Sequence, residues 1–261
     1  MEDNSEEQKE IASSLYGAYR SGTPLSPLRE KYELTLSDAY RLQKAVTERR
    51  RSGEGPRVGY KVGFTSEAIQ NELDINEPAY GHLLADTLQS DGRINLEPLI
   101  EPKVEAELAI RLEEPITGPV TTAEILTATK AVVPVIEIVD SRIDGWNVTA
   151  AEAIADNALS GRVICGDRIF DPSSLDTNLA LEGIRVRKNG VQEATGVGAD
   201  VLGHPCNAVR WLARSLRDRD DRLEAGDIVL TGSVTPLIPL APDDFIEVQF
   251  ATFGTVTVRG T

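Results

Sequence analysis

The chain has 261 residues and a formal net charge of −15, because 42 Asp and Glu outnumber 27 Lys and Arg. This acidity argues against nucleic acids and anionic membranes as partners, since phosphate binding requires a basic surface. Hydrophobic residues make up 41% of the chain, and no apolar run approaches the roughly 18 to 20 residues that span a bilayer. We therefore expect a globular protein, and the acidic start "MEDNSEEQKE", unlike a signal peptide, predicts a cytoplasmic location.

Cysteine usage and the choice of basic residue add two expectations. Cys165 and Cys206 have no C-x-x-C partner, which indicates neither a disulfide framework nor a zinc site. Of the 27 basic residues, 20 are Arg and only seven are Lys. Together with the acidic excess, this bias suggests a halophilic source with a salt-rich cytoplasm. The alternative is an ordinary acidic enzyme.

Residues 7 to about 50 are predicted to form helices. Apolar residues recur at helical spacing in two passages, "EEQKEIASSLYGAYRSG" and "LTLSDAYRLQKAVTERRRSG". These apolar positions are Ile11, Leu15, Ala18, Ala39, Leu42 and Val46. The connector between the passages, "GTPLSPLREKYE", is punctuated by proline, so we expect it to separate two helices.

After Pro56 short β-branched runs alternate with Gly and Pro, a texture typical of strands. The runs are "RVGYKVGF", "VEAELAIRL", "AVVPVIEIV", "RVICG", "GIRVRKNG", "DIVLTGSV" and "FIEVQFATFGTVTVRG". Two further passages are predicted to be helical, "TTAEILTATKA" and "HPCNAVRWLARSLRDRDDRL". We therefore predict an α+β protein, in which an N-terminal helical segment (residues 1–55) precedes a mixed, β-rich core (residues 56–261) within one structural unit.

The stretch "EPKVEAELAI" places two carboxylates in an otherwise apolar run. On a strand, Glu105 and Glu107 point to the same face and lie about 7 Å apart, while Val104 points to the other face. One interpretation is an amphipathic strand with a solvated outer face, completed by Lys103 and Arg111. The other is a site that uses both carboxylates.

Glu137 favours the second interpretation. It is the only charge in the apolar run 131–139, and a lone buried carboxylate costs several kcal/mol unless it is paired or bound to a metal. Three carboxylates without a His or Cys ligand favour a hard divalent ion, Mg²⁺, Mn²⁺ or Ca²⁺, over zinc. The alternative is a buried ion pair between Glu137 and Arg142.

Lys61 is a second charge in an apolar strand, and it is flanked by Gly59 and Gly63. The glycines would let the backbone approach a ligand closely, and a desolvated lysine can serve as an acid, a base or an anion clamp. We therefore predict a catalytic lysine with a depressed pKa. The alternative is a strand lysine whose ammonium reaches solvent.

Three polar stretches are candidates for substrate binding: "DSRIDGW", "IADNALSG" and "TGSVTPL". Arg142, Ser160 and Ser233 are the residues in them that we expect to contact a substrate. Each stretch could instead shape a turn, because Asp, Asn and Ser side chains commonly do so.

The chain resembles a known enzyme family through motifs that occur in the family's order. They are "GYKVGFTS", "EPAYGHL", "PKVEAELA", "IEIVDSRI", "IADNALSG" and "LEAGDIVLTGS". Together they are similar to the 2-oxopent-4-enoate (2-hydroxypenta-2,4-dienoate) hydratase and 4-oxalocrotonate decarboxylase family, within the fumarylacetoacetate hydrolase superfamily. The resemblance extends over about residues 10 to 259.

The resemblance implies a divalent-metal site for Mg²⁺ or Mn²⁺, with Glu105, Glu107 and Glu137 at the ligand positions. It also places Lys61 at the active-site lysine and Ser160 in the turn that faces the substrate. The fold it implies is a distorted β-roll or barrel of the fumarylacetoacetate hydrolase C-terminal type, preceded by helices. Members of the superfamily are commonly homo-oligomers, so we expect one here.

The favoured function is a metal-dependent hydro-lyase that adds water to a 2-hydroxy-2,4-dienoate, giving a 4-hydroxy-2-oxo acid, in aromatic meta-cleavage catabolism. The alternative is decarboxylation of 2-oxo-3-hexenedioate. Hydrolysis of a C–C bond is less favoured, because residues 1–55 contain no His and the chain has only His82 and His204. A non-catalytic partner subunit would be signalled by a lost metal ligand, and none is lost. Ala79 stands where many hydratases carry Asp, so a proton-transfer role at that position has no carrier.

Overall fold

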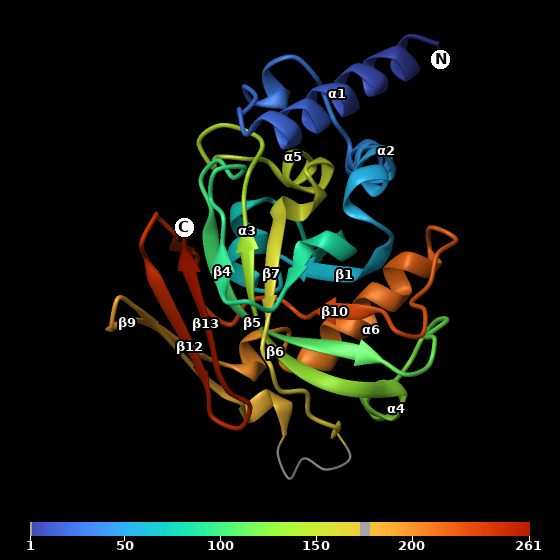
Figure 1. The fold of residues 1–261 in the computed structure, drawn as a ribbon. Helices are drawn as coiled ribbons and strands as arrows, with labels where there is room; N and C mark the ends of the chain where they lie inside the picture. The colour runs from blue at the N-terminus through green and yellow to red at the C-terminus, as the bar shows by residue number, and fades with distance from the viewer. Residues whose placement is uncertain (1, 173–177) are drawn as a thin grey trace.

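The computed structural model describes residues 2–172 and 178–261 (Figure 1). Its helices are α1 (Glu2–Ser21), α2 (Leu36–Glu54), α3 (Glu67–Glu72), α4 (Thr122–Ala128), α5 (Ala150–Ala155) and α6 (Pro205–Arg217). Its strands are β1 (Arg57–Gly63), β2 (Ala79–Leu84), β3 (Leu88–Gln89), β4 (Arg93–Ile94), β5 (Lys103–Leu112), β6 (Thr129–Val139), β7 (Ser160–Cys165), β8 (Gly183–Lys188), β9 (Val191–Val197), β10 (Ile228–Leu230), β11 (Ile238–Pro239), β12 (Phe245–Phe250) and β13 (Gly254–Gly260). None of the helices in these two ranges combines the length and the apolar character that crossing a bilayer requires.

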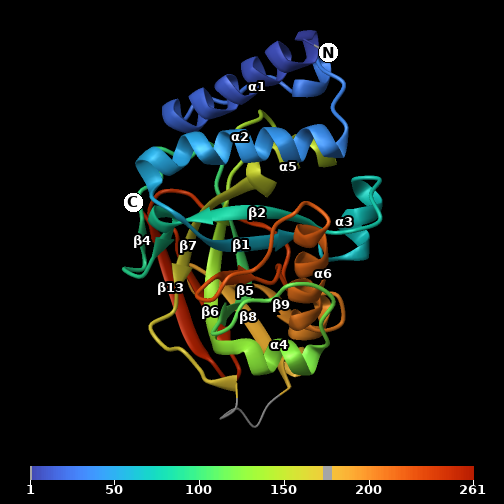
Figure 2. The same ribbon diagram turned by 90° about the vertical axis from the view of Figure 1, so that its right-hand side faces the viewer.

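The two N-terminal helices lie on top of the β body, with α1 outermost and α2 between α1 and the first sheet (Figure 2). Helix α2 starts in a capping box, where Thr35 and Asp38 each accept a hydrogen bond from the other's backbone N–H. The helical apolar stripes predicted from the sequence are buried, and they meet α5 in one cluster. Burial of these stripes stabilises the helices, because isolated helices of this length are only marginally stable in water.

The first sheet has the strand order β2-β1-β10-β5-β6-β7-β3, with β11 pairing at one end of β5. Strands β5 and β6 are long antiparallel neighbours in its middle, and Glu105 lies directly opposite Glu137 in their register. Every residue of β6 except Lys130 is buried. The apolar run 131–139 therefore forms a central strand covered on both faces, as its composition predicts.

The second sheet has the order β4-β13-β12-β8-β9 and curls beside the first (Figure 1). Both sheets contribute to one large apolar core, which α6 closes with Val209, Leu212 and Leu216. Helix α6 starts at Pro205, and His204 Nδ1 accepts a hydrogen bond from the N–H of Cys206 at 3.0 Å. The chain thus forms the mixed α+β architecture with N-terminal helices that the sequence predicts.

Several elements differ from the sequence expectation. The helix expected over residues 121–131 ends at Ala128, because Thr129 already pairs with Leu112 of β5. The single run 245–260 is a hairpin, β12 and β13, with Gly254 at φ 84° after its turn. Helices α3 and α5 and strands β2, β3, β4, β9 and β11 lie outside the predicted runs. The end of α2 lies beside the boundary drawn at residue 55, and the division of the chain into two parts there stays a prediction.

Candidate metal and substrate site

Three carboxylates meet on one face of the β5–β6 pair. Glu105 and Glu107 project from β5 and Glu137 from β6, and one oxygen of each lies within 4.8 Å of the others. Like charges directly opposite each other destabilise a sheet, so this pairing requires a compensating charge. We call these three residues, together with Lys61, the carboxylate site.

The carboxylate site is buried, so the interpretation of a solvated strand face is wrong. Glu107 and Glu137 are 0% exposed, while Glu105 is half-buried. Glu107 Oε2 accepts a hydrogen bond from the N–H of Gly232 at 2.8 Å. Glu107 Oε1 and both carboxylate oxygens of Glu137 are buried and accept no hydrogen bond. Buried oxygens of this kind are costly unless a cation or donor reaches them.

Lys61 supplies one positive charge to this site. It projects from β1 with 4% of its surface exposed, and its Nζ lies 3.3 Å from Glu137 Oε2. The same ammonium donates a hydrogen bond to the carbonyl oxygen of Ala158 at 3.0 Å. The alternative of a solvent-reaching lysine is therefore wrong. Glu137 pairs with this lysine and not with Arg142.

The predicted depression of the Lys61 pKa is also wrong. Burial lowers the pKa of Lys61, but the negative charges of Glu137, Glu105 and Glu107 outweigh burial, and the net effect raises this pKa. Partners on two other strands produced this result, and the local sequence around Lys61 does not reveal them.

The electrostatics of the carboxylate site favour a divalent cation. Desolvation raises the pKa of Glu105 to about 7, opposed by Lys61 and reinforced by Glu137. Desolvation and the other two carboxylates raise the pKa of Glu107 well above its usual range. One ammonium cannot balance three ionised carboxylates, so without a metal ion the site takes up protons, as the raised pKa values of Glu105 and Glu107 indicate. A hard cation such as Mg²⁺ or Ca²⁺ fits this all-oxygen donor set and the unpartnered oxygens.

The two glycines that flank Lys61 are under different structural constraints. A Cβ on Gly59 would lie 1.9 Å from the carbonyl oxygen of Ile228, so Gly59 is required by the neighbouring strand β10 and not by a ligand. A Cβ on Gly63 would meet Lys61 Nζ at 3.4 Å. Only Gly63 therefore bears on the space around the ammonium.

A cavity of about 490 Å³ opens onto the carboxylate site. Lys61, Glu105 and Glu107 line part of it, and Ser233 lines it too. Ser233 Oγ donates to the carbonyl oxygen of Thr235 at 2.8 Å and accepts from the N–H of Thr235 at 3.2 Å. Ser233 thus shapes the 231–237 turn at the cavity wall, and its contact with a substrate stays a prediction.

Arg142 and Ser160 do not line this cavity in the described part of the chain. Arg142 is buried and donates from Nε to Asp156 Oδ1 at 2.6 Å, while its Nη1 lies 3.8 Å from Asp140 Oδ2. We call Arg142, Asp140 and Asp156 the arginine cluster. Ser160 is buried as well, and its carbonyl oxygen accepts a hydrogen bond from Tyr19 at 2.8 Å. Both residues thus have partners within the protein, and their contact with a substrate stays a prediction.

The turn between α5 and β7 contributes to the cavity in a way that the sequence analysis missed. Asn157, Ala158 and Leu159 have φ of 55°, 50° and 60°, a left-handed conformation that is unfavourable for Ala and Leu. This turn aims the Ala158 carbonyl at Lys61. A Cβ on Gly81 would lie 2.3 Å from the Asn157 carbonyl oxygen, so the glycine permits the close approach.

Ala79 does not line the cavity that opens onto the carboxylate site. It is fully buried in the cluster of helical side chains and stands opposite Gly63 in the β1–β2 ladder. Its methyl group packs there and can carry no proton.

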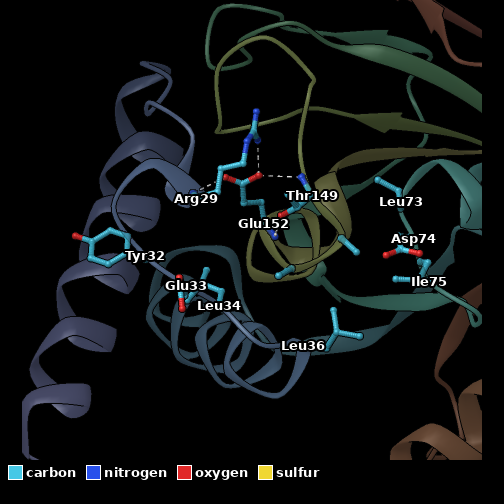
Figure 3. A pocket seen from close by; sticks show the side chains of 12 residues that line it. Arg29, Tyr32, Glu33, Leu34, Leu36, Leu73, Asp74, Ile75, Thr149 and Glu152 are labelled. Atoms are coloured by element: carbon cyan, nitrogen blue, oxygen red, sulfur yellow. Dashed lines mark hydrogen bonds and ion pairs between the residues drawn. The ribbon is translucent and has the colours of Figure 1, made fainter.

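A second hollow lies among residues 29–36, α5 and the 73–75 segment, and Glu152 is the carboxylate in it that has partners within the hollow (Figure 3). Glu152 accepts hydrogen bonds from the backbone N–H and Nη1 of Arg29 and from the N–H of Thr149, at 2.8, 2.7 and 2.8 Å. This carboxylate needs no further partner, so the hollow is not a candidate metal site.

The sequence is similar to a known protein family and to named hydratases. Residues 69–259 match the model of the fumarylacetoacetate (FAA) hydrolase C-terminal family. The chain is 39% identical over 254 residues to 2-keto-4-pentenoate hydratase of Paraburkholderia xenovorans (strain LB400), covering 96% of this chain and 94% of that protein. It is 38% identical over 253 residues to 2-hydroxyhexa-2,4-dienoate hydratase of Comamonas testosteroni, covering 95% of each.

A solved structure is similar over almost the whole fold. It is 4-oxalocrotonate decarboxylase from Pseudomonas putida G7, complexed with magnesium and adipate. The TM-score is 0.93 at 32% sequence identity, and the alignment covers 98% of both chains. The helices at the N-terminus are therefore shared with that protein as well as the β body.

Proposed function

The chain belongs to the fumarylacetoacetate hydrolase family, and we propose that it is a divalent-metal-dependent hydro-lyase that adds water to a 2-hydroxy-2,4-dienoate. The product is a 4-hydroxy-2-oxo acid. Reactions of this class belong to the breakdown of aromatic rings opened by meta cleavage, and we place the protein there. The native metal that we propose is Mg²⁺, with Mn²⁺ able to replace it.

One observation carries the proposal. Three carboxylates converge, two of them lining a cavity, and three of their oxygens are buried and accept no hydrogen bond, in a chain 38–39% identical to named hydratases. The carboxylate cluster supports the presence of a metal ion, and the sequence similarity supports hydration as the reaction.

Glu105, Glu107 and Glu137 would hold the metal ion through oxygen ligands. When bound, the ion would act as a Lewis acid that stabilises the negative charge of the dienolate. To reach the 4-hydroxy-2-oxo acid the 2-hydroxyl group must lose its proton and C5 must gain one, which leaves a C3–C4 double bond; water then supplies hydroxide to C4 and a proton to C3. Lys61 is the residue that we assign to carry the proton, because its ammonium borders the cavity and is fixed by Ala158.

The environment of Lys61 suits donation more than abstraction. Its raised pKa keeps the ammonium protonated near neutral pH in the metal-free protein. The Ala158 carbonyl oxygen and Glu137 both contact Nζ and so limit its movement. A positioned ammonium can give a proton to the substrate or hold the substrate's carboxylate in place.

A decarboxylase is the second candidate. The observation that favours it is the TM-score of 0.93 to the 4-oxalocrotonate decarboxylase structure. That reaction would use the same carboxylate site on a 2-oxo-enedioate and release its distal carboxylate as CO₂.

The test is an assay of the purified protein with Mg²⁺ on 2-hydroxypenta-2,4-dienoate and on 2-oxo-3-hexenedioate in parallel. Loss of ultraviolet absorbance from the dienoate, without CO₂ from the dioate, is the expected result. EDTA should abolish turnover, and Mg²⁺ or Mn²⁺ should restore it. CO₂ release at the faster rate would instead assign the decarboxylase, and restoration by zinc alone would contradict the all-oxygen site.

A further inference from the structure

Lys61 is held by two partners of different kinds. Its Nζ lies 3.3 Å from Glu137 Oε2, and it donates a hydrogen bond to the carbonyl oxygen of Ala158 at 3.0 Å. Glu137 is an expected metal ligand, so a bound cation would compete with the ammonium for its oxygens. The Ala158 carbonyl lies outside the carboxylate cluster. The contacts that orient this carbonyl therefore also help to orient the ammonium.

The carbonyl belongs to the turn of residues 157–159, which we call the anchor turn. Asn157, Ala158 and Leu159 have φ of 55°, 50° and 60°, whereas the other non-glycine residues with positive φ in the described ranges occur singly. The left-handed region is unfavourable for Ala and Leu, and several residues in succession rarely adopt it. Such a backbone persists only where surrounding contacts hold it in place.

The side chain of Asn157 supplies contacts of this kind. Its Oδ1 accepts a hydrogen bond from the backbone N–H of His82 at 2.8 Å, and its Nδ2 donates to the carbonyl oxygen of His82 at 2.9 Å. His82 lies on β2, which stands at the end of the strand order of the first sheet. The carboxamide thus pairs with this edge as the backbone of a neighbouring strand would.

The position of Asn157 excludes direct contact with a substrate in the cavity. Asn157 is 1% exposed and does not line the cavity, whereas the next two residues of the anchor turn do. Ala158 and Leu159 have no polar side-chain atoms, so Asn157 supplies the only side-chain hydrogen bonds that the anchor turn can make. Any influence of Asn157 on the reaction must therefore pass through the turn.

We propose that Asn157 is a positioning residue: its carboxamide fixes the anchor turn to β2, and the turn presents the carbonyl that orients the Lys61 ammonium. The proposal rests on the proposed function, in which Lys61 carries a proton to the substrate. Proton transfer depends steeply on where the donor stands, because a displacement of about 1 Å can lower the rate by about 100-fold. Asn157 thus affects the rate without contacting the reacting atoms.

Two substitutions at position 157 test this role. Asn157→Gly removes both hydrogen bonds to His82, while glycine tolerates the left-handed backbone. With saturating Mg²⁺ we expect its kcat to fall by about 10- to 100-fold. KM and the Mg²⁺ dissociation constant, measured by calorimetry, should change little, because the three carboxylates stay in place. Asn157→Asp, when ionised, keeps an acceptor but loses the donor, so its kcat should fall less. An unchanged kcat in both variants would overturn the proposal.

Gln43 offers a matched control, because it is another fully buried carboxamide bonded to β2. Its Nε2 donates to the carbonyl oxygens of Tyr80 at 2.8 Å and Ile154 at 2.9 Å, and neither of these residues belongs to the anchor turn. Gln43→Leu should lower the melting temperature about as much as Asn157→Gly does, but its kcat should stay close to that of the wild type. Equal losses of kcat in the two variants would show that Asn157 only stabilises the fold.

A double-mutant cycle tests whether the effect passes through the lysine. In a Lys61→Met background the anchor turn has no ammonium to orient, so adding Asn157→Gly should lower kcat no further. Independent losses that multiply in the double variant would contradict the proposal.

The last measurement does not depend on turnover. The chain has seven lysines, and in protein labelled with ¹⁵N-lysine the Nζ signal of Lys61 is the one that Lys61→Met removes. With Mg²⁺ bound, we expect the ammonium protons of Lys61 to exchange with water faster in Asn157→Gly than in the wild type or Gln43→Leu, because the carbonyl that holds them is displaced. This result with no hydration of any dienoate would defeat the proposed function alone. Unchanged exchange in Asn157→Gly would defeat the positioning role even if hydration is observed.

Discussion

Two clusters of buried charge lie close together along β6, and they are built differently. In the arginine cluster, Asp156 accepts from Arg142 Nε at 2.6 Å and from its backbone N–H at 2.8 Å. Asp140 accepts from the backbone N–H groups of Ile100 and Glu101 at 3.1 and 2.8 Å. The carboxylate site has three negative groups and one ammonium, and three of its oxygens accept no hydrogen bond.

The difference shows how structural and functional buried charges can be told apart. A buried charge is tolerated when the protein itself supplies its partners, and removal of one partner is then expensive. A cluster that remains negative and unsatisfied depends on a charge from outside the chain. The arginine cluster should therefore control stability, and the carboxylate site should control activity.

The largest effect expected is on activity in the carboxylate site. Glu137→Gln or Glu107→Gln should lower kcat by at least about 10³-fold, or about 4 kcal/mol, because one metal ligand is lost. The metal-free Glu107→Gln variant should be no less stable than the wild type in thermal melting, since the neutral amide removes a like charge, whereas Glu137→Gln also removes the ion-pair partner of Lys61 and is compared by activity alone. The control is Glu247→Gln, a strand glutamate in a half-exposed ion pair with Arg187. Retention of more than about a tenth of wild-type turnover, a loss under about 1.4 kcal/mol, would refute the ligand assignment.

Lys61→Met removes the only cation of the carboxylate site and keeps an apolar stem of similar length. With saturating Mg²⁺ we expect kcat to fall by about 10² to 10⁴, as when a general acid is lost. Lys130→Met is the matched control, because Lys130 forms an exposed ion pair with Glu113. If kcat stayed constant and only KM rose, Lys61 would bind the substrate carboxylate and the proton would come from elsewhere.

In the arginine cluster the expected effect is on stability. Asp156→Ala leaves the Arg142 guanidinium buried without its main partner, and it should lower the free energy of unfolding by about 3 to 5 kcal/mol. Denaturant melts give this value, and Glu247→Ala, which breaks a half-exposed pair, should cost no more than about 1 kcal/mol. An Asp156→Ala protein as stable as that control would show that the two clusters do not differ as proposed.

A smaller effect links the metal to pH. In the metal-free protein the pKa of Glu105 is raised to about 7, and the pKa values of Glu107 and Glu137 are raised too. The folded state therefore binds protons more tightly than the unfolded state. The contribution of these groups to the stability of the folded protein decreases as pH rises from about 5 toward 8.

A bound divalent cation should relieve that loss. Stabilisation by Mg²⁺, about 2.7 kcal/mol at 100 times its dissociation constant, should therefore be larger at pH 8 than at pH 5. Melting temperatures with and without Mg²⁺ at both pH values measure this, and Glu107→Gln should reduce the difference. An equal effect of Mg²⁺ at both pH values would mean that Mg²⁺ does not compete with protons for the carboxylates.

The smallest effect expected is that of salt, which acts on the surface and leaves both buried clusters alone. A net charge of −15 stores self-repulsion, and at about 1 M salt the Debye length shrinks to roughly 3 Å. The melting temperature should rise with KCl in the wild type and in Asp156→Ala by similar amounts. A value that stays flat from about 0.1 to 2 M KCl would show that the acidity has no bearing on stability.

Local patterns were sufficient for the long elements. Helices α1, α2 and α6 and strands β5 and β6 carry regular apolar spacing over many residues, and that spacing follows from which side chains must be buried. Helix α5 is six residues long and β2 is interrupted by Gly and His, so neither has a periodic signal. Their positions depend on contacts with α2 and β1.

The same contrast between local sequence pattern and tertiary contacts holds within the carboxylate site. The sequence by itself determined which carboxylates belong together, because Glu137 is a lone charge in an apolar run and Glu105 and Glu107 share a strand face. The tertiary structure decided the rest. Lys61 meets Glu137 from 76 positions away, and the resulting attraction reverses the pKa shift that burial alone would give. Arg142, meanwhile, pairs with Asp156 at the C-terminal end of α5 and leaves Glu137 to pair with the lysine. Electrostatic partners are set by distances in space, and a linear chain carries no direct record of those distances.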